Sequence, residues 1–173
     1  MQTIVRLLAF LNLFPSMEVF MTTIAIISDT HGLLRPEVCE HLKQVDYILH
    51  AGDINTKETY EELLKYAPLF VVRGNNDKEW AEFLPSSLTI AVDNITFYLI
   101  HNKREIKQLP PEVNIVVYGH SHKYSLERKD EVLWLNPGSC GHKRFYHDVT
   151  MAILTVEDDR YRIYKVNFNT AYS

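Results

Sequence analysis

Short apolar runs alternate with amphipathic segments along the first half of the chain. The runs at residues 24–27, 47–49 and 69–72 are each bounded by polar residues, a pattern typical of strands buried on both faces. Between them, residues 35–44 and 56–66 carry apolar positions at helical spacing. Strands that alternate with helices predict a sheet that is at least partly parallel.

The second half of the chain carries strand patterns with little helix between them. Apolar runs at 88–92 and 95–100 flank Asp93-Asn94, a two-residue turn signal that predicts a hairpin. Five further strands are expected at 113–118, 124–128, 132–135, 150–156 and 160–166. With no linker or repeat in between, the pattern predicts one domain of two packed sheets with helices outside.

Composition and charge narrow the class of protein. The 173 residues carry 18 basic and 22 acidic side chains, a net charge of −4, and 46% are hydrophobic. These values are typical of one soluble globular domain, and they lack the basic excess of a duplex nucleic-acid binder. Cys39 and Cys140 form neither a disulfide framework nor a zinc knuckle. We therefore expect two reduced thiols and a cytoplasmic protein.

Residues 1–20 differ from the rest of the chain. Their apolar run, 4–14, is interrupted by Arg6 and Asn12 and stopped by Pro15, so it is too short to span a membrane. It also lacks the basic start and small-residue cleavage site of a signal peptide. We expect an N-terminal extension or short helix preceding a single domain at 21–173, with no membrane partner.

Five predicted strands are each followed by Asp, Asn or His. The carboxyl ends of strands in open α/β sheets are where ligands bind. Carboxylate, amide and imidazole groups without thiolates suit divalent metal ions in a catalytic rather than a structural site. Seven such groups exceed what one ion needs and suit two ions that share a carboxylate. The candidate ligands are Asp29, His31, Asp53, Asn75, His101, His120 and His122.

Each of these motifs is short enough to occur by chance, but their joint order along the chain is specific. Asp-x-His, Gly-Asp, Gly-Asn-x-Asp, a single His and Gly-His-x-His follow one another between Ile24 and Val156. This order resembles the calcineurin-like metallophosphoesterase superfamily. The short length and Asn136-Pro137-Gly138-Ser139 are similar to its small YfcE-type phosphodiesterase branch. The resemblance implies an α/β (α+β) fold, a four-layer αββα sandwich of two mixed β-sheets with flanking helices.

The resemblance also implies roles for the seven residues. Asp29, His31 and His122 would hold the first metal ion, and Asn75, His101 and His120 the second. Asp53 would bridge the two ions. A hydroxide between them would attack phosphorus in line, so the resemblance implies a metal-dependent phosphodiesterase that acts on small phosphodiesters. Mixed ligands of this kind suit manganese, which we expect, or iron, zinc, nickel or cobalt.

The sequence departs from the family at two positions. Asn76 stands where nuclease and protein-phosphatase branches have a His that acts on the leaving group, and Asn102-Lys103 replaces a common Gly-His. An Asn side chain can donate a hydrogen bond but cannot act as a general acid. We therefore expect a catalytic contribution from Asn76 that favours substrates with good leaving groups.

Other polar residues have simpler interpretations. We expect His50 to be buried, hydrogen-bonded and supportive of Asp53. Lys103 is either a charge near the phosphate or a solvated lysine. The loop residues His142, Lys143, Arg144 and His147 line a phosphate pocket or are solvated. The candidates for a phosphate-binding arginine are Arg35, Arg73 and Arg144.

Three alternatives stay open. The retromer scaffold subunit shares the expected fold and binds other proteins, so a non-catalytic scaffold is one of them. A nuclease is a second, although the acidic balance argues against polymeric substrates. A phosphomonoesterase is the third. The sequence also leaves the oligomeric state open, a homo-oligomer included.

Overall fold

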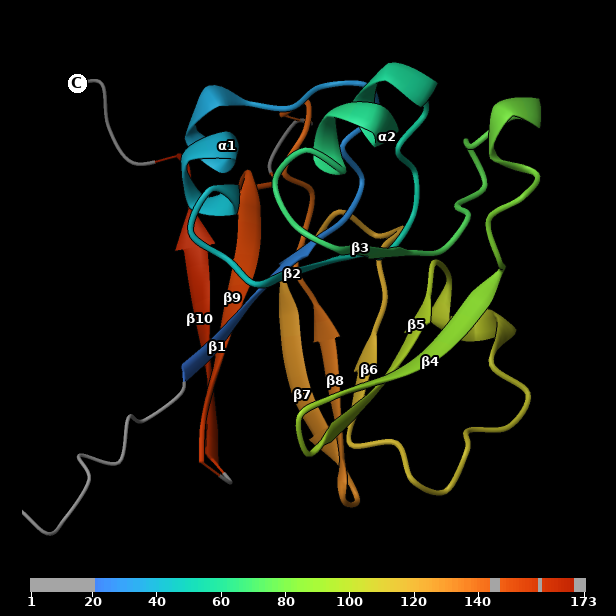
Figure 1. Ribbon diagram of the computed structural model, residues 1–173. Coiled ribbons are helices and arrows are strands. Elements are labelled where there is room, and N and C mark those ends of the chain that lie inside the picture. Colours follow the sequence, from blue (N-terminus) through green and yellow to red (C-terminus); the bar gives the residue numbers. More distant parts are fainter. Residues whose placement is uncertain (1–20, 144–146, 159, 170–173) are drawn as a thin grey trace, which may run out of the picture.

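The computed structural model describes residues 21–143, 147–158 and 160–169. It contains two five-stranded sheets that face each other, with two short helices on the outer side of one sheet (Figure 1). The expected extension, residues 1–20, lies outside the described residues. No helix in the described part of the chain is long and apolar enough to span a membrane.

The first sheet has the order β10-β9-β1-β2-β3. The strands β1, β2 and β3 pair in parallel, and β9 and β10 extend the sheet by antiparallel pairing. A helix connects each parallel pair, as the alternating pattern predicts. The elements are β1 (Met21–Ile27), α1 (Pro36–Leu42), β2 (Tyr47–His50), α2 (Lys57–Leu63), β3 (Leu69–Val71), β9 (Thr150–Glu157) and β10 (Arg160–Asn167).

The second sheet has the order β4-β5-β6-β8-β7 and is also mixed. The hairpin expected around Asp93-Asn94 is confirmed as β4 (Ser87–Val92) and β5 (Ile95–Ile100). The central pairs are parallel, and β7 closes the other edge by antiparallel pairing. The remaining strands are β6 (Ile115–Val117), β7 (Ser125–Lys129) and β8 (Val132–Asn136).

Strand β1 shows how the two faces of the first sheet are filled. Ile24 and Ile26 point into the core between the sheets, where they join Phe97 and Leu135 of the second sheet. Ala25 and Ile27 point the other way, toward the helices. Alternate residues of a strand face opposite sides, so an uninterrupted apolar run is what a strand buried on both faces requires.

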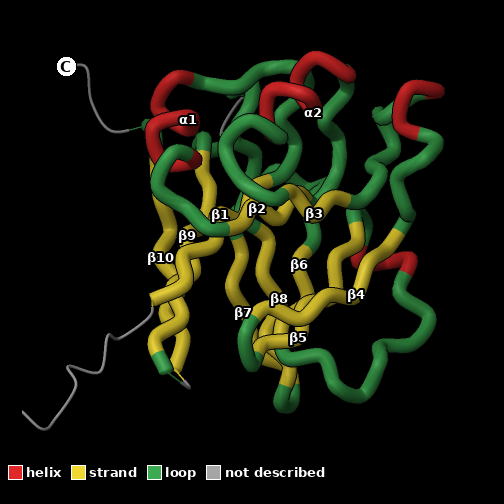
Figure 2. The backbone as a smooth tube through the Cα atoms, in the orientation of Figure 1, coloured by secondary structure: helices red, strands yellow, loops and turns green. Residues whose placement is uncertain are grey.

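The two outer layers differ in thickness. Helices α1 and α2 cover the first sheet through Val38, Leu42 and Leu63, and they lie at the periphery in Figure 2. The outer face of the second sheet is covered by the segment after β5, which contains only a 3-10 helix, η2 (Lys103–Glu105). The four-layer α+β sandwich is thus confirmed, with a thin fourth layer.

Candidate metal centre

Five strands end at one rim of the sandwich and deliver all seven predicted side chains. The loops after β1, β2 and β3 leave the first sheet, and those after β5 and β6 leave the second. Main-chain hydrogen bonds hold neighbouring loops together, from Asp29 N to Gly52 O (3.0 Å) and from Gly119 N to His101 O (3.0 Å). The carboxyl ends of these five strands therefore face one shared space between the two sheets.

Five of the seven residues have left-handed backbone conformations, which side chains other than glycine rarely adopt. Such conformations cost roughly 1–3 kcal/mol each and persist where the surroundings enforce them. They turn the chain sharply at the strand ends and bring successive polar side chains toward the same space. The φ angles are 55° at Asp29, 49° at His31, 59° at Asp53, 69° at His120 and 57° at His122.

The first cluster of polar atoms comprises Asp29, His31 and His122. The His122 Nε2 lies 3.2 Å and the His31 Nε2 lies 3.8 Å from Asp29 Oδ1. The two Nε2 atoms are 3.3 Å apart. The His31 Nδ1 donates to the side-chain oxygen of Asn55 at 3.2 Å, which assigns the proton to Nδ1 and leaves a lone pair on Nε2.

The second cluster comprises Asp53, Asn75, His101 and His120. The His101 Nε2 lies 3.4 Å from Asp53 Oδ2 and 3.0 Å from Asn75 Oδ1. The His120 Nδ1 approaches the same Asn75 oxygen at 2.9 Å. The two clusters meet, because the His31 Nε2 lies 3.9 Å from Asp53 Oδ2. All seven predicted residues are thus brought together.

A buried oxygen atom tests whether a metal ion fits these clusters. Asp29 is fully buried, and among the described residues its Oδ1 accepts no hydrogen bond. Such an orphaned oxygen is costly unless a cation or water satisfies it. Ligand atoms of Asp29, His31 and His122 lie within 4.8 Å of one another, and so do those of Asp29, Asp53 and His101. Both groups fit a divalent ion.

The charge of Asp53 is stabilised by its surroundings. Burial alone would raise the pKa of this carboxyl group, but hydrogen bonds and the nearby His101 outweigh it and hold the pKa well below its usual value. Asn76 donates twice, from its main-chain N to Oδ1 (2.7 Å) and from its side-chain Nδ2 to Oδ2 (2.6 Å). The Asn76 amide group is thus directed at Asp53, which it positions.

A main-chain hydrogen bond on the Nδ1 side of the ring fixes the orientation of His101. Its Nδ1 donates to Ala51 O at 2.7 Å, which directs Nε2 at Asp53 and Asn75. Burial lowers the pKa of His101, but the Asp53 carboxylate outweighs burial and raises it. The same negative charge would attract a cation to this nitrogen.

His50 is buried and hydrogen-bonded, as the sequence predicts. Its Nδ1 accepts the main-chain N–H of Gly52 at 3.1 Å, so its Nε2 carries the proton and donates to Thr30 Oγ1 at 3.1 Å. His50 thereby joins the loop after β1 to the loop that carries Asp53. Burial lowers the pKa of His50 to about 3.

The lowered pKa of His50 predicts an acid-sensitive fold. Unfolded His50 takes up a proton below about pH 6.5, whereas folded His50 stays neutral down to about pH 3. Between these values the unfolded chain binds more protons, so the free energy of unfolding falls with falling pH, by up to about 1.4 kcal/mol per unit. Urea unfolding of chelated protein at pH 7 and pH 5 measures this slope.

His50→Asn is the matching variant, because its Oδ1 can still accept the Gly52 N–H but it does not titrate. We expect this variant to be less stable at pH 7, because it lacks the contact with Thr30. The slope of its free energy of unfolding against pH should be smaller by the contribution of about one proton. An unchanged slope in this variant would assign the acid sensitivity to other groups.

Asp77 is a structural member of the site that the sequence analysis did not single out. It is 2% exposed, and its carboxylate accepts three main-chain N–H groups, from Asp53 (3.0 Å), Asn55 (2.7 Å) and Gly74 (2.8 Å). It therefore joins the loop after β3 to the loop after β2. Its position in Gly-Asn-x-Asp was the only signal available in the sequence.

Two serines hold Asp29 in a comparable way. Ser28 Oγ donates to Asp29 Oδ2 at 2.6 Å, and Ser139 Oγ donates to Asp29 O at 2.8 Å. The main-chain N of His120 also donates to Asp29 Oδ2, at 3.1 Å. These three donors occupy one carboxylate oxygen and the carbonyl group, and they leave Oδ1 to face the two imidazoles.

Two glycines in the motifs are required by close packing. A Cβ atom at Gly74 would overlap the main chain and carboxylate of Asp53, and one at Gly119 would overlap Ser28 Oγ. Any side chain at either position would push a strand-end loop away from the clusters. The glycines of Gly-Asn and Gly-His thus allow the loops to meet.

The remaining polar candidates from the sequence have different surroundings in the structure. Arg35 Nε donates to Gly141 O (2.8 Å) and Arg73 Nε to Asp77 O (3.2 Å), so both guanidinium groups brace loops. His142, Lys143 and His147 are exposed, and Arg144 lies outside the described residues. Both cysteines are free, and burial raises the pKa of Cys140 to about 12.

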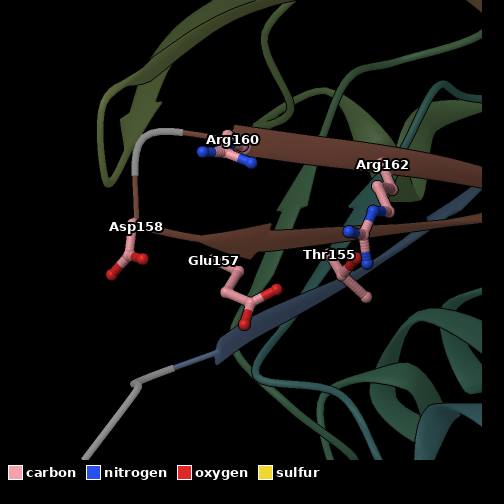
Figure 3. A pocket seen from close by; sticks show the side chains of 5 residues that line it. All are labelled: Thr155, Glu157, Asp158, Arg160 and Arg162. Carbon is pink, nitrogen blue, oxygen red and sulfur yellow. The ribbon is translucent and has the colours of Figure 1, made fainter. Parts of the chain in front are cut away.

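Two hollows differ in their relation to the clusters. One, of about 430 Å³, reaches His120 and lies over the loops after β5 and β6. The other, of about 300 Å³, lies at the far tip of the β9–β10 hairpin, where Arg160 and Arg162 line it together with Glu157 and Asp158 (Figure 3). Glu157 pairs with Met21 at the start of β1, the end of that strand opposite Asp29, so this second hollow is not part of the site.

Comparison with known proteins identifies the family of this chain. Residues 22–159 match the calcineurin-like phosphoesterase superfamily domain. The chain belongs to this superfamily. A probable metallophosphoesterase of Bacillus subtilis is 31% identical over 149 residues, which cover 79% of the chain and 85% of the relative. A phosphodiesterase of Methanocaldococcus jannaschii is 28% identical over 162 residues, covering 80% and 96%. The family expected from the order of the motifs is thus confirmed.

Solved structures share the fold of this phosphoesterase domain. YfcE, a phosphoesterase from Escherichia coli, aligns with a TM-score of 0.64 at 21% identity, covering 86% of this chain and all of that one. Vacuolar Protein Sorting 29 from Cryptosporidium parvum aligns with a TM-score of 0.70 at 17% identity, covering 86% and 98%. Both similarities concern the fold alone, and they include an enzyme and a sorting protein.

Proposed function

We propose that this protein is a divalent-metal-dependent phosphodiesterase that hydrolyses small phosphodiesters. The observation that carries the proposal is the buried Asp29 Oδ1, which faces two imidazole nitrogens and accepts no hydrogen bond among the described residues. Next to it, a second carboxylate with a lowered pKa faces a third imidazole. Such an arrangement of donors is suited to cations.

We assign the ligands to two ions, with manganese as the expected metal. Asp29, His31 and His122 would hold one ion, and Asn75, His101 and His120 the other. Asp53 would serve both, since its Oδ2 lies within 4 Å of His31 and of His101. When bound, the ions would polarise the phosphate oxygens and lower the pKa of a water molecule.

The chain's own contribution is to orient these ligands before substrate arrives. Asn76 fixes both Asp53 oxygens, and Ala51 and Asn55 fix the ring orientations of His101 and His31. Ligands held in this way lose little freedom when they bind, and such supporting contacts are commonly worth 10–100-fold in metal affinity or activity. Asn76 acts here as a positioning residue, since its amide group is committed to Asp53.

The choice of diesters rests on the relatives, which include phosphodiesterases by name. The sorting-protein neighbours favour a second candidate, a scaffold that binds other proteins at this fold. All seven positions hold ligand-type side chains in this chain, which favours the enzyme. Turnover separates the candidates.

The test is metal reconstitution with a panel of esters. Chelated protein is loaded with manganese, iron, zinc, nickel or cobalt, and bound metal is counted by elemental analysis. Turnover is then measured on bis(p-nitrophenyl) phosphate and on p-nitrophenyl phosphate. We expect about two ions per chain and hydrolysis of the diester at least roughly tenfold faster than of the monoester, abolished by chelation and restored by metal.

Three results would contradict the proposal. Undiminished turnover in chelated protein would exclude a metal-dependent reaction. A preference for the monoester would reassign the substrate class. Stoichiometric metal without turnover on either ester would favour the scaffold.

A further inference from the structure

The hollow beside His120 carries a concentration of positive charge that the proposed reaction does not use. Lys103, Arg104 and Lys123 all line it, on a chain whose net charge is −4. Among the described residues no carboxylate lies within ion-pair distance of any of the three, although five lysine–carboxylate pairs occur elsewhere. The acidic residue of the lining, Glu127, faces Lys129 instead, at 3.9 Å.

The Lys103 side chain is held in place within this hollow. Its Nζ donates to Tyr118 Oη at 3.2 Å and lies 4.5 Å from the centre of the Tyr118 ring. Tyr118 is itself 2% exposed and packs against Trp134. A lysine with a neutral hydrogen-bond partner and a rigid aromatic support keeps its charge available for a ligand.

The position of the hollow links it to the metal centre. His120 belongs both to the lining and to the second cluster, where its Nδ1 faces Asn75 at 2.9 Å. Lys103 follows His101 by two residues, and Lys123 follows His122 directly. A ligand in the hollow would therefore lie against the group that the metal centre acts on.

We propose that this hollow is a subsite for a second phosphate group, so that the preferred substrates are phosphodiesters carrying an additional phosphate monoester. This proposal rests on the proposed function. A phosphate dianion is compact and accepts hydrogen bonds from several directions, and lysines bind it as point charges. The volume of about 430 Å³ holds a phosphate with part of a sugar or base, and Tyr124 adds an aromatic lining surface.

The test compares two dinucleotides that differ by one group. Dithymidine joined by a single diester is measured with and without a 5′-terminal phosphate, in manganese-loaded protein. We expect the terminal phosphate to raise kcat/KM about tenfold, as charge-assisted hydrogen bonds typically allow. In Lys103→Gln, and further in Lys103→Gln/Lys123→Gln, the ratio should fall toward one.

Lys43→Gln is the matched control. It removes the same charge from the exposed outer surface, where Lys43 pairs with Glu40 at 2.6 Å, and it should leave the ratio unchanged. A ratio near one in the unmodified protein would overturn the proposal. So would a ratio that Lys103→Gln/Lys123→Gln does not alter.

A binding measurement separates this proposal from the proposed function. Calorimetry with thymidine 5′-phosphate on chelated protein at pH 8 should show binding that weakens with added salt and is lost in Lys103→Gln/Lys123→Gln. If neither the dinucleotides nor bis(p-nitrophenyl) phosphate is hydrolysed, the proposed function fails while this binding still supports the subsite. Absence of thymidine 5′-phosphate binding would overturn the subsite. Binding of an acidic peptide without binding of thymidine 5′-phosphate would overturn it as well.

Discussion

Asp53→Asn is expected to lower kcat/KM for an aryl phosphodiester by about 10³-fold or more and to leave the fold intact. Loss of a single supporting contact at a metal site costs roughly 10–100-fold, and Asp53 is a carboxylate ligand candidate that faces both clusters. The substitution also replaces one of the two carboxylate oxygens to which Asn76 donates with an amide nitrogen, which cannot accept. Initial rates, bound metal by elemental analysis and circular dichroism measure the three effects.

Asp130→Asn is the control for that variant. Asp130 lies in the exposed turn between β7 and β8, with a φ of 52° that Asn tolerates. This variant loses the same charge at a distance from the clusters. Its kcat/KM for the aryl phosphodiester and its metal content should therefore stay unchanged. Full activity in Asp53→Asn would contradict the assignment of a shared ligand.

Asp77→Ala should produce a large loss of stability at this rim. It would leave the main-chain N–H groups of Asp53, Asn55 and Gly74 without their acceptor. An unsatisfied buried donor costs about 1–3 kcal/mol, so we expect the free energy of unfolding to fall by about 3 kcal/mol or more. Urea unfolding measures this loss, and metal affinity should fall with it because the loop that carries Asp53 is released.

Two further variants calibrate the effect. Asp46→Ala removes a carboxylate from an exposed site, where it accepts one main-chain N–H, from Thr23 at 2.7 Å, and it should cost about 1 kcal/mol or less. Asp77→Asn keeps one acceptor oxygen but turns an amide group toward a donor, so it should fall between the two. Equal stability of Asp77→Ala and Asp46→Ala would show that Asp77 does not join the loops.

The sequence predicts the strands and the polar cluster well, because both follow from local patterns. Ile24–Ile27 is a short apolar run of the kind that a strand buried on both faces requires, and each ligand-type residue lies within a few positions after such a run. Once parallel strands share an edge, the loops that follow them must meet. The ends of the parallel strands therefore indicate where the candidate ligands lie.

The supporting contacts could not be predicted in this way. Asp77 and Ser139 act on the main chain of other loops, 24 and 110 residues away in sequence, and their partners depend on how the loops pack in three dimensions. The commitment of Asn76 to Asp53 and the support of Lys103 by Tyr118 are equally non-local. Side-chain chemistry indicates what such residues can do, whereas only the fold shows which partner they have.

The origin of the ligand-type residues from two different sheets has a consequence for the apoprotein. Asp29, His31, Asp53 and Asn75 leave the first sheet, and His101, His120 and His122 leave the second. A cation bound between them would link the strand-end loops of the two sheets. It would also add RT ln(1 + [metal]/Kd) to the free energy of unfolding. Melting temperature would then serve as a gauge of metal occupancy, and the empty protein would open first at this rim.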